Sequence, residues 1–548
     1  MGADADGMGH VGTVFPRDLG VDQGACVRGL TAAWLLNAPE RIFAGRKGQE
    51  ARPLDRLLQD LVMAGSQFSP HQVAVLVDLS RPLEGVLAAG AFCQAIGVRL
   101  AVSLPLEDNA LVRAGLTSCP PFGEIAGCTL VLAVGDPFSS HPAVADAVRD
   151  MQFGGRGNKL IALDTAWGRT SREADEAVTV SPVKLAAFMA ALAVECGAGE
   201  VSAALGAAGT DGICVAAGIP AAQVKRLAAQ LKGAKSVGIL LGHPLGRYSS
   251  GAAVAAAAAQ AAAALKAKVW PLLVSTNSAA LPRLKQQYRA VELGGLLSDA
   301  AAGRLKALLV VGVDPASLLP EELWKRLAQA CELVCWAGSL ESPFAAEAEF
   351  VVPLALPWEE EGTVLAPSGK PARFIPWLPK PATTVTVKEL MARLGALAGV
   401  WAALPIDPAQ LMAGAPTAAA VGDLVSPEAI SGAAEPAAGQ AFVVGAPEPQ
   451  GYTGGISLSA AIWQRRLAVE EKASASPEVA AEIGLMAKGP VELKDGTEAT
   501  VLCTPAQSGE GRAVALPSHW PLLRELLKWR EADGRVEPAP AAVRVRKV

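Results

Sequence analysis

Three adjacent glutamates, Glu359, Glu360 and Glu361, are the residues that most suggest chemistry. They lie in the stretch LPWEEEGTVLAPSGKPARF. Carboxylates at this density could ligate a metal ion or act as acid and base. Successive side chains of an extended chain point to opposite faces, so three in a row cannot all face one metal. The run therefore does not by itself define a site.

Thiols are the second group of side chains that could do chemistry. The nine cysteines include no CxxC pair, which excludes a zinc ribbon and an ordinary iron–sulfur run. Cys331 and Cys335 are the only close pair, and they lie in an apolar stretch typical of a buried strand. We interpret them as structural thiols, with metal ligands as the alternative.

Two segments repeat one pattern. VLAVGDPFSSHP and LLVVGVDPASLLP each place an apolar strand before a Gly, Asp and Pro turn that opens a helix. Glycine permits a sharp turn, aspartate can cap the helix, and proline presets its first turn. Such strand ends bind ligands in open α/β sheets, with helix N-termini facing anions. Ordinary turns are the alternative reading. The predicted cofactor-binding residues here are Gly135, Asp136, Pro137, Gly312, Asp314 and Pro315.

The elements that position these turns are short runs apolar on both faces, separated by amphipathic stretches. Such runs are typical of parallel strands covered by helices, and the alternation predicts α/β domains with doubly wound parallel sheets. A small β-rich domain ends the chain after a segment rich in Ala, Pro and Gly. The expected α/β strands are 71–80, 99–104, 128–137, 158–168, 236–246, 268–276, 305–315 and 332–339.

Composition limits the function classes. The chain has 548 residues, a net charge of −5 and no basic block before its last residues, so nucleic acid is not an expected partner. The alanine-rich run 251–268 predicts a soluble helix, not a membrane span. The N-terminus lacks a signal-peptide pattern, so we expect a cytoplasmic protein. Charged residues are only 18%, which indicates either a surface covered by partner subunits or a bias towards alanine.

Several motifs resemble those of the molybdopterin oxidoreductase superfamily. They are CVRGLTAAWLLNAPERIFAG, KLIALDTAWGRTSREADEAVTVSP with its Asp164 and Thr170, and EAEFVVPLALPWEEEGTVLAPSGKPARF. The second half looks most like the large iron–sulfur subunit of respiratory complex I, the NADH-quinone oxidoreductase. The last domain is similar to the family's dinucleotide-binding β-barrel. The resemblance implies a molybdopterin guanine dinucleotide with Mo or W. It adds these candidate cofactor-binding residues: Asp164, Glu361, Gly362, Thr363 and His519.

The resemblance also separates the three glutamates, and the strand series and composition divide the chain. It ties Glu361 to Gly362-Thr363 at a strand end facing a cleft, so Glu359 and Glu360 are expected to be solvated. The predicted division is a vestigial N-terminal segment (1–50), two α/β domains (51–200 and 201–400), a linker (401–455) and the β-barrel (456–548).

Departures from the family pattern bear on activity. Cys26 matches the last ligand of the family's N-terminal [4Fe–4S] cluster, but no cysteine precedes it, so this chain cannot hold that cluster alone. Cys119 and Ser118 are the candidates for a Mo or W ligand, yet neither stands in a recognisable ligand motif, and we assign no metal ligand. The family's Asn, Glu and Arg are replaced by the following residues: Ala366, Ser368 and Lys370.

These departures favour a degenerate subunit of a multi-subunit redox complex. Its expected partners are iron–sulfur and diaphorase-type subunits, and membrane contact would come only through them. The alternative is a catalytic Mo/W-pterin subunit of the formate dehydrogenase or formylmethanofuran dehydrogenase type. A third reading keeps a nucleotide or pterin as a static structural ligand.

Overall fold

The computed structural model describes most of the chain. The described residues are 2–5, 11–15, 37–166, 168–198, 203–242, 245, 250–313, 318–376, 378–400, 407–413, 436–446, 473–495, 497–506, 512–517, 520–532, 535–539 and 541–548. Within these ranges, no helix is both long and apolar enough to cross a membrane.

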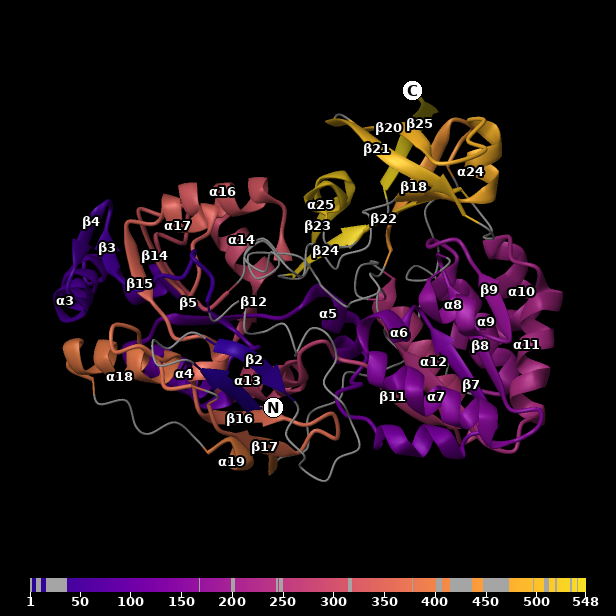
Figure 1. Cartoon of the computed structure of the whole chain (residues 1–548), viewed down its shortest axis with the longest axis horizontal. Helices are drawn as coiled ribbons and strands as arrows, with labels where there is room; N and C mark the ends of the chain where they lie inside the picture. The colour runs from indigo at the N-terminus through magenta and orange to yellow at the C-terminus, as the bar shows by residue number, and fades with distance from the viewer. Residues whose placement is uncertain are drawn as a thin grey trace.

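An eight-stranded sheet organises one body of the molecule (Figure 1). Six neighbouring strands pair in parallel, and the hairpin β3–β4 joins antiparallel at the β15 edge. The strand order is β12 (Val291–Glu292), β6 (Arg99–Ser103), β5 (Val73–Asp78), β13 (Ala307–Val311), β14 (Leu333–Gly338), β15 (Phe350–Pro353), β3 (Gly45–Lys47) and β4 (Glu50–Arg52).

A five-stranded sheet organises the second body, and all its pairings are parallel. Its order is β11 (Lys268–Pro271), β10 (Val237–Leu241), β7 (Leu130–Val134), β8 (Lys159–Asp164) and β9 (Glu176–Thr179). The predicted α/β class with parallel sheets is therefore confirmed. The strand pairing nevertheless differs from the sequential division into 51–200 and 201–400, because β5 and β6 pair with the later β13 and β12. Local periodicity identifies a strand but not its neighbour.

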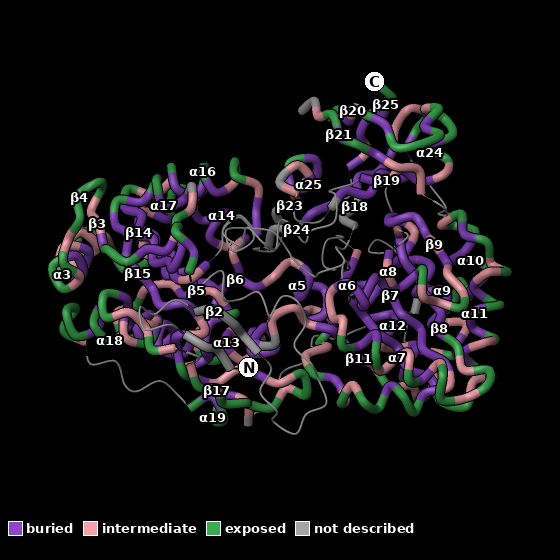
Figure 2. Tube along the Cα trace, viewed as in Figure 1, coloured by how far each residue is buried: buried purple, intermediate pink, exposed green. Residues whose placement is uncertain are grey.

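Both sheets are covered by helices on both faces, and buried residues fill the layers between them (Figure 2). Around the eight-stranded sheet lie α3 (Leu54–Gly65), α4 (Leu83–Ile96), α13 (Leu281–Tyr288), α14 (Leu293–Ala301), α16 (Glu321–Gln329), α17 (Pro343–Glu347) and α18 (Val387–Leu397). Around the five-stranded sheet lie α5 (Leu106–Arg113), α6 (Pro137–Ser140), α7 (Pro142–Gly154), α8 (Arg169–Glu173), α9 (Leu185–Cys196), α10 (Ala203–Ala217), α11 (Ala221–Gly233) and α12 (Gly251–Leu265).

The alanine-rich helices lie inside the second body. Helices α9 and α12 contact each other, and ten residues of each are buried. Small side chains let helix backbones approach closely, and this packing leaves little room for larger residues. Alanine in α9 and α12 is therefore explained by internal packing, without a partner subunit.

A closed β-barrel forms the C-terminal domain, as predicted. Its strands in order are β18 (Gln440–Ala446), β22 (Ala513–Pro517), β19 (Ala473–Ala475), β21 (Thr497–Pro505), β20 (Gly489–Asp495) and β25 (Ala541–Lys547). Strand β18 falls inside the predicted linker 401–455, so that boundary was wrong. Helices α24 (Pro477–Glu482) and α25 (Pro521–Leu526) and the hairpin β23 (Lys528–Ala532)–β24 (Arg535–Ala539) complete the domain.

Smaller elements complete the described chain. They are β1 (Gly2–Ala5), β2 (Val11–Phe15), β16 (Gly362–Leu365), β17 (Pro371–Phe374), α19 (Pro408–Ala413) and the 3₁₀ helices η1 (Pro70–Gln72), η2 (Phe122–Gly127), η4 (Thr276–Ala280) and η5 (Pro357–Glu359).

Candidate functional site

Glu359 is a buried structural carboxylate. Its two oxygens accept hydrogen bonds from the two terminal nitrogens of Arg41, each at 2.8 Å, and the side chains are 3% and 4% exposed. One oxygen also accepts the Leu356 N–H at 2.8 Å. A bidentate pair with this geometry is among the stronger charge-assisted contacts in proteins. The expectation that Glu359 is solvated was wrong, because η5 turns the chain inward.

Glu360 is buried as well, against Arg81. Arg81 Nη1 donates to Glu360 Oε1 at 3.1 Å and to the Ala355 carbonyl at 2.7 Å, while Nη2 donates to Ser339 Oγ at 3.1 Å. Burial raises the pKa of Glu360 to about 7, although Arg81 opposes this shift. The expectation of a solvated Glu360 was therefore also wrong. The sequence reasoning missed Arg81, since nothing local marks it as buried.

Glu361 is the exposed member of the three. Its carboxylate pairs with Arg373 at 3.3 Å, and both side chains are more than half exposed. The next two residues instead dock on the first turn of α4. The Thr363 N–H and hydroxyl donate to the two carboxylate oxygens of Glu84 at 2.8 and 2.7 Å. A Cβ at Gly362 would lie 2.6 Å from Pro82 Cβ. Gly362-Thr363 thus has a visible structural role in this contact.

The turn that follows meets the segment proposed to hold a metal ligand. The Cys119 N–H donates to the Pro367 carbonyl at 2.9 Å. Gly369 has φ 77° and lies so close that an added Cβ would be 3.2 Å from Ser118 Cβ. The Ala366 N–H closes the turn on the Lys370 carbonyl at 2.8 Å. The turn that contains Ala366, Ser368 and Lys370 therefore contacts Ser118 and Cys119 through Pro367 and Gly369.

Cys119 does not have the character of a metal ligand. It is buried in a cluster with Ile125, Phe138 and Trp270, and burial raises the pKa of its thiol to about 11. The neighbours of the thiol in this cluster are apolar and offer no polar group to support a charged metal centre. Among the residues that the structure describes, no three His, Cys, Asp or Glu side chains group as a metal site. A Mo or W centre at Cys119 does not fit these surroundings.

Asp136 joins two turns of the five-stranded body. One oxygen accepts the Arg169 N–H at 2.7 Å and the Ser139 hydroxyl at 2.9 Å, and the other accepts the N–H and hydroxyl of Thr170. An added Cβ at Gly168 would lie 2.1 Å from this carboxylate. Asp136 was expected to cap the helix that it precedes, but its side chain instead binds the start of α8.

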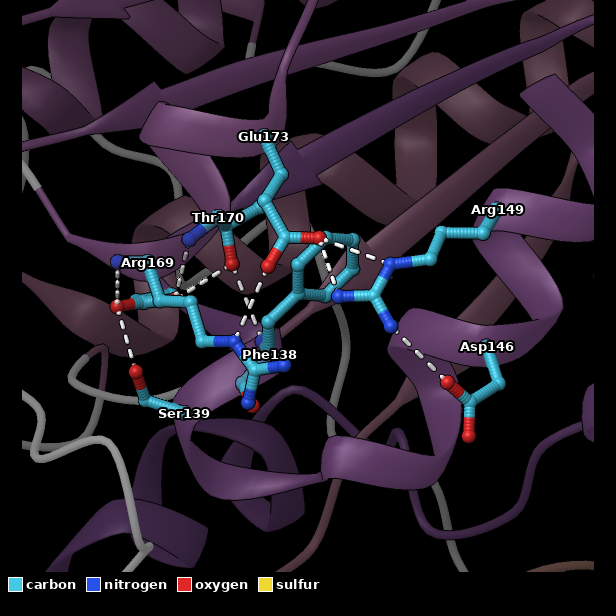
Figure 3. Close-up of polar contacts among 8 residues, drawn as sticks. Phe138, Ser139, Asp146, Arg149, Arg169, Thr170 and Glu173 are labelled. Atoms are coloured by element: carbon cyan, nitrogen blue, oxygen red, sulfur yellow. Dashed lines mark hydrogen bonds and ion pairs between the residues drawn. The ribbon is translucent and has the colours of Figure 1, made fainter.

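An ion-pair network surrounds this cap (Figure 3). Glu173 receives hydrogen bonds from Arg149 at 2.7 and 3.1 Å and from Arg169 at 3.1 Å. Arg149 also reaches Asp146 within α7 at 3.1 Å. The Phe138 N–H donates to Thr170 Oγ1 at 3.1 Å. Together these contacts fix α7 and α8 at the carboxyl edge of the sheet.

Asp164 is the best candidate for binding a ligand at the carboxyl edge of the five-stranded sheet. It ends β8 and is 3% exposed, and its Oδ1 accepts the Thr165 N–H at 2.7 Å. Its Oδ2 is buried and has no hydrogen-bond partner in the described structure. Burial and the neighbouring Asp136 raise the pKa of Asp164 well above its usual value. An orphaned buried oxygen costs free energy unless something binds it.

The two repeated turns have equivalent positions in the two sheets. The Gly135 N–H donates to the Leu163 carbonyl at 2.9 Å, and the Gly312 N–H donates to the Ala337 carbonyl at 2.8 Å. Both glycines have positive φ, 84° and 69°. Pro137 begins α6. Four predicted positions lie outside the described residues: Cys26, Asp314, Pro315 and His519.

Asp108 is a buried carboxylate that the sequence reasoning did not find. It accepts the Val274 and Ser275 N–H groups at 2.6 and 2.9 Å and the Ser278 hydroxyl at 2.7 Å. Burial raises its pKa to about 7. Asp108 therefore holds the loop after β11 to α5. The residues that bury Asp108 are far away in the sequence, so no local sequence pattern predicts that it is buried.

Comparison with solved structures identifies the fold. The chain is similar to acetylene hydratase from Pelobacter acetylenicus, with a TM-score of 0.73 and 12% sequence identity over 100% of this chain and 98% of that chain. At this identity the likeness shows that the two chains share a fold and no more. No family model and no curated protein sequence matches the chain.

Proposed function

We propose that this chain is a scaffold subunit of a multi-subunit redox complex that keeps the molybdopterin oxidoreductase fold without a metal of its own. The electron carriers would lie on iron–sulfur and diaphorase-type partner subunits, as the resemblance to the large iron–sulfur subunit of complex I suggests. Those partners would provide any membrane contact.

One observation carries the proposal: the 366–370 turn is seated on Ser118 and Cys119. The backbone N–H of Cys119 donates a hydrogen bond to the Pro367 carbonyl. Its thiol lies in an apolar cluster and is neutral there. The replacement of Asn, Glu and Arg by Ala366, Ser368 and Lys370 removes polar groups that could orient a substrate, and lysine lacks arginine's planar fork. A turnover site is not supported by these side chains.

A retained nucleotide is compatible with this role, and Asp164 supports it. When protonated, the carboxyl of Asp164 can donate a hydrogen bond through the oxygen that has no partner among the described residues. Asp164 and the turn at Gly135 would then hold the nucleotide portion of a pterin cofactor as a static ligand. The chemistry that such a cofactor supplies elsewhere is redox transfer at its metal, which the apolar surroundings of Cys119 do not accommodate.

The experiment is to replace the candidate ligands in the assembled complex. The complex is purified through a tag on this chain, with iron–sulfur and diaphorase-type subunits expected to copurify. Ser118→Ala and Cys119→Ala should leave its electron-transfer rate unchanged. Cys128→Ala is the matched control, because Cys128 lies in the same apolar cluster as Cys119.

Two outcomes would contradict the proposal. Loss of turnover with Cys119→Ala but not with Cys128→Ala would favour the catalytic Mo/W-pterin alternative of the formate or formylmethanofuran dehydrogenase type. If the chain purifies from its native cells without any redox partner, the proposed scaffold role is contradicted.

A further inference from the structure

The chain passes between the two α/β bodies along two segments, and α5 lies in the first of them (Figure 1). This first crossing leaves β6 of the eight-stranded sheet and runs through α5 and η2 to β7 of the five-stranded sheet. The second crossing follows β11 and leads through η4 to α13, and we call its residues 272–278 the return segment. Strands β7 to β11 lie in the five-stranded sheet, whereas β3 to β6 and β12 to β15 lie in the eight-stranded sheet. Any change in how the two bodies sit must therefore be accommodated at these crossings.

The return segment is hydrogen-bonded to both bodies. On the side of the five-stranded body, His141 Nε2 donates to the Leu273 carbonyl at 3.0 Å. On the side of the eight-stranded body, Asn277 Nδ2 donates to the Arg81 carbonyl, and Asn277 Oδ1 accepts the Leu365 N–H, both at 2.9 Å. The return segment is thus the joint between the two bodies.

Asp108 of α5 fastens the middle of the return segment to the first crossing. Its carboxylate accepts the Val274 and Ser275 N–H groups at 2.6 and 2.9 Å and the Ser278 hydroxyl at 2.7 Å. A side chain, and not a strand ladder, therefore holds these two backbone N–H groups. Loss of this one carboxylate from its position would free the middle of the joint.

The surroundings of Asp108 contain no cation that pairs with it. Asp108 is fully buried, and the return segment and α12, which pack on α5, carry no titratable side chain. The nearby cations and histidine, Arg113, Arg283 and His141, form no ion pair with its carboxylate, whose partners are the three donors above. Burial raises the pKa of Asp108 to about 7, and the neighbouring Glu107 adds to this shift. An exposed aspartate has a pKa of about 4.

We propose that Asp108 is a pH-sensitive latch on the joint between the two α/β bodies, which holds the return segment at acidic pH and releases it as pH rises. A carboxyl ionises more easily in water than in this buried position, so an opening that hydrates Asp108 becomes more favourable as pH rises. The latched form keeps its proton up to about pH 7, whereas the opened form loses it near pH 4. The stability of the latch is therefore complete at low pH and is lost between these two values. This inference does not depend on the role proposed above for Cys119.

Hydrogen–deuterium exchange of the full chain, followed by mass spectrometry from pH 5 to 8, tests the latch. The protection factors of the Val274 and Ser275 amides, corrected for the intrinsic exchange rate at each pH, report the opening of the joint. Because one proton is linked to the opening, these factors should fall by close to tenfold per pH unit up to about pH 7 and then level off. The buried strand β13 is the internal reference and should stay more protected. Equal protection in β13 and in the return segment at every pH would show global unfolding and overturn the proposal.

Variants assign the pH dependence to Asp108. Asp108→Asn should abolish the fall in protection of the Val274 and Ser275 amides. Asp299→Asn is the matched control and should keep it, because Asp299 is a buried carboxylate inside the eight-stranded body, bonded to Arg304 at 2.7 and 2.9 Å.

Ser278→Ala gives a second, independent test. It removes a hydrogen bond that favours the ionised carboxylate, so protection should level off at a higher pH than in wild type. A wild-type protection that is flat with pH, or a fall that persists in a folded Asp108→Asn variant, would overturn the proposal. If Asp108→Asn does not fold, an unchanged levelling pH in Ser278→Ala would overturn it.

Discussion

Replacing Arg81 by Met tests the finding that the glutamate run is structural. Arg81 and Glu360 are 5% and 3% exposed, and Arg81 also holds the Ala355 carbonyl and the Ser339 hydroxyl. Arg81→Met removes these hydrogen bonds, and the pKa of Glu360, which is about 7 beside Arg81, rises further, so the buried carboxyl takes up a proton instead of staying charged. The expected cost is therefore about 1–3 kcal/mol, that of the lost hydrogen bonds. The Ala355 carbonyl keeps its hydrogen bond from Ser339 Oγ at 2.9 Å, so it is not left without a donor when Arg81 is removed.

Urea unfolding followed by tryptophan fluorescence gives the free energy of unfolding. Arg81→Met should lower it by about 1–3 kcal/mol. Arg373→Met is the matched control, because it breaks the exposed pair with Glu361 and should cost less than about 1 kcal/mol. A double-mutant cycle of Arg81→Met with Glu360→Met should give a coupling energy of about 1–3 kcal/mol.

The same pair predicts a pH dependence with a definite sign. The pKa of Glu360 is raised from its usual value to about 7, so the folded protein holds a proton that the unfolded chain releases. The contribution of Glu360 to stability is therefore present at low pH and is lost as pH rises from about 4.5 towards 7. Glu360→Gln should remove this slope. Equal costs for Arg81→Met and Arg373→Met, together with an unchanged slope in Glu360→Gln, would refute the burial of this pair as the cause.

Three further predictions concern the carboxyl edge and the thiols. Gly168→Ala should cost about 1–3 kcal/mol in urea unfolding, because its Cβ would lie 2.1 Å from the Asp136 carboxylate; no cost would contradict the cap. Asp164→Asn should make the ligand-free chain more stable than wild type, because the raised pKa of Asp164 lowers the stability of wild type once this carboxyl ionises in the unfolded chain. The stability difference should grow as pH rises above about 4. A stability difference that does not change with pH would contradict the burial of the Asp164 carboxyl. In a Cys26→Ala background, an aromatic disulfide reagent should label Cys119 only after unfolding, because the thiol is 7% exposed and its pKa is about 11; rapid labelling of the native protein would contradict its burial.

Much of the architecture could be predicted from the sequence. Runs apolar on both faces indicated parallel strands, and the repeated Gly and Asp turns indicated equivalent strand ends, which Gly135 and Gly312 occupy. Which strands pair could not be predicted, because periodicity is a local property. Strands β5 and β13 pair although they lie more than 200 residues apart in the sequence.

The candidate site was less predictable for the same physical reason. Whether a carboxylate is solvated depends on distant partners, and Arg41 and Arg81 reach Glu359 and Glu360 from another part of the chain. Asp136 follows the ordinary pattern of a helix cap, yet it caps α8 because the sheet brings two strand ends together. The contact of Cys119 with Pro367 likewise arises only in the folded molecule.

The metal content of the chain, purified within its complex, decides between a scaffold and a catalytic subunit. Inductively coupled plasma mass spectrometry measures Mo and W, and fluorescence of the oxidised, denatured supernatant measures released pterin. Because Cys119 lies in an apolar cluster under the 366–370 turn, Mo and W should be far below one atom per chain, whether or not a pterin nucleotide is released. About one Mo or W atom per chain together with pterin would contradict the scaffold role.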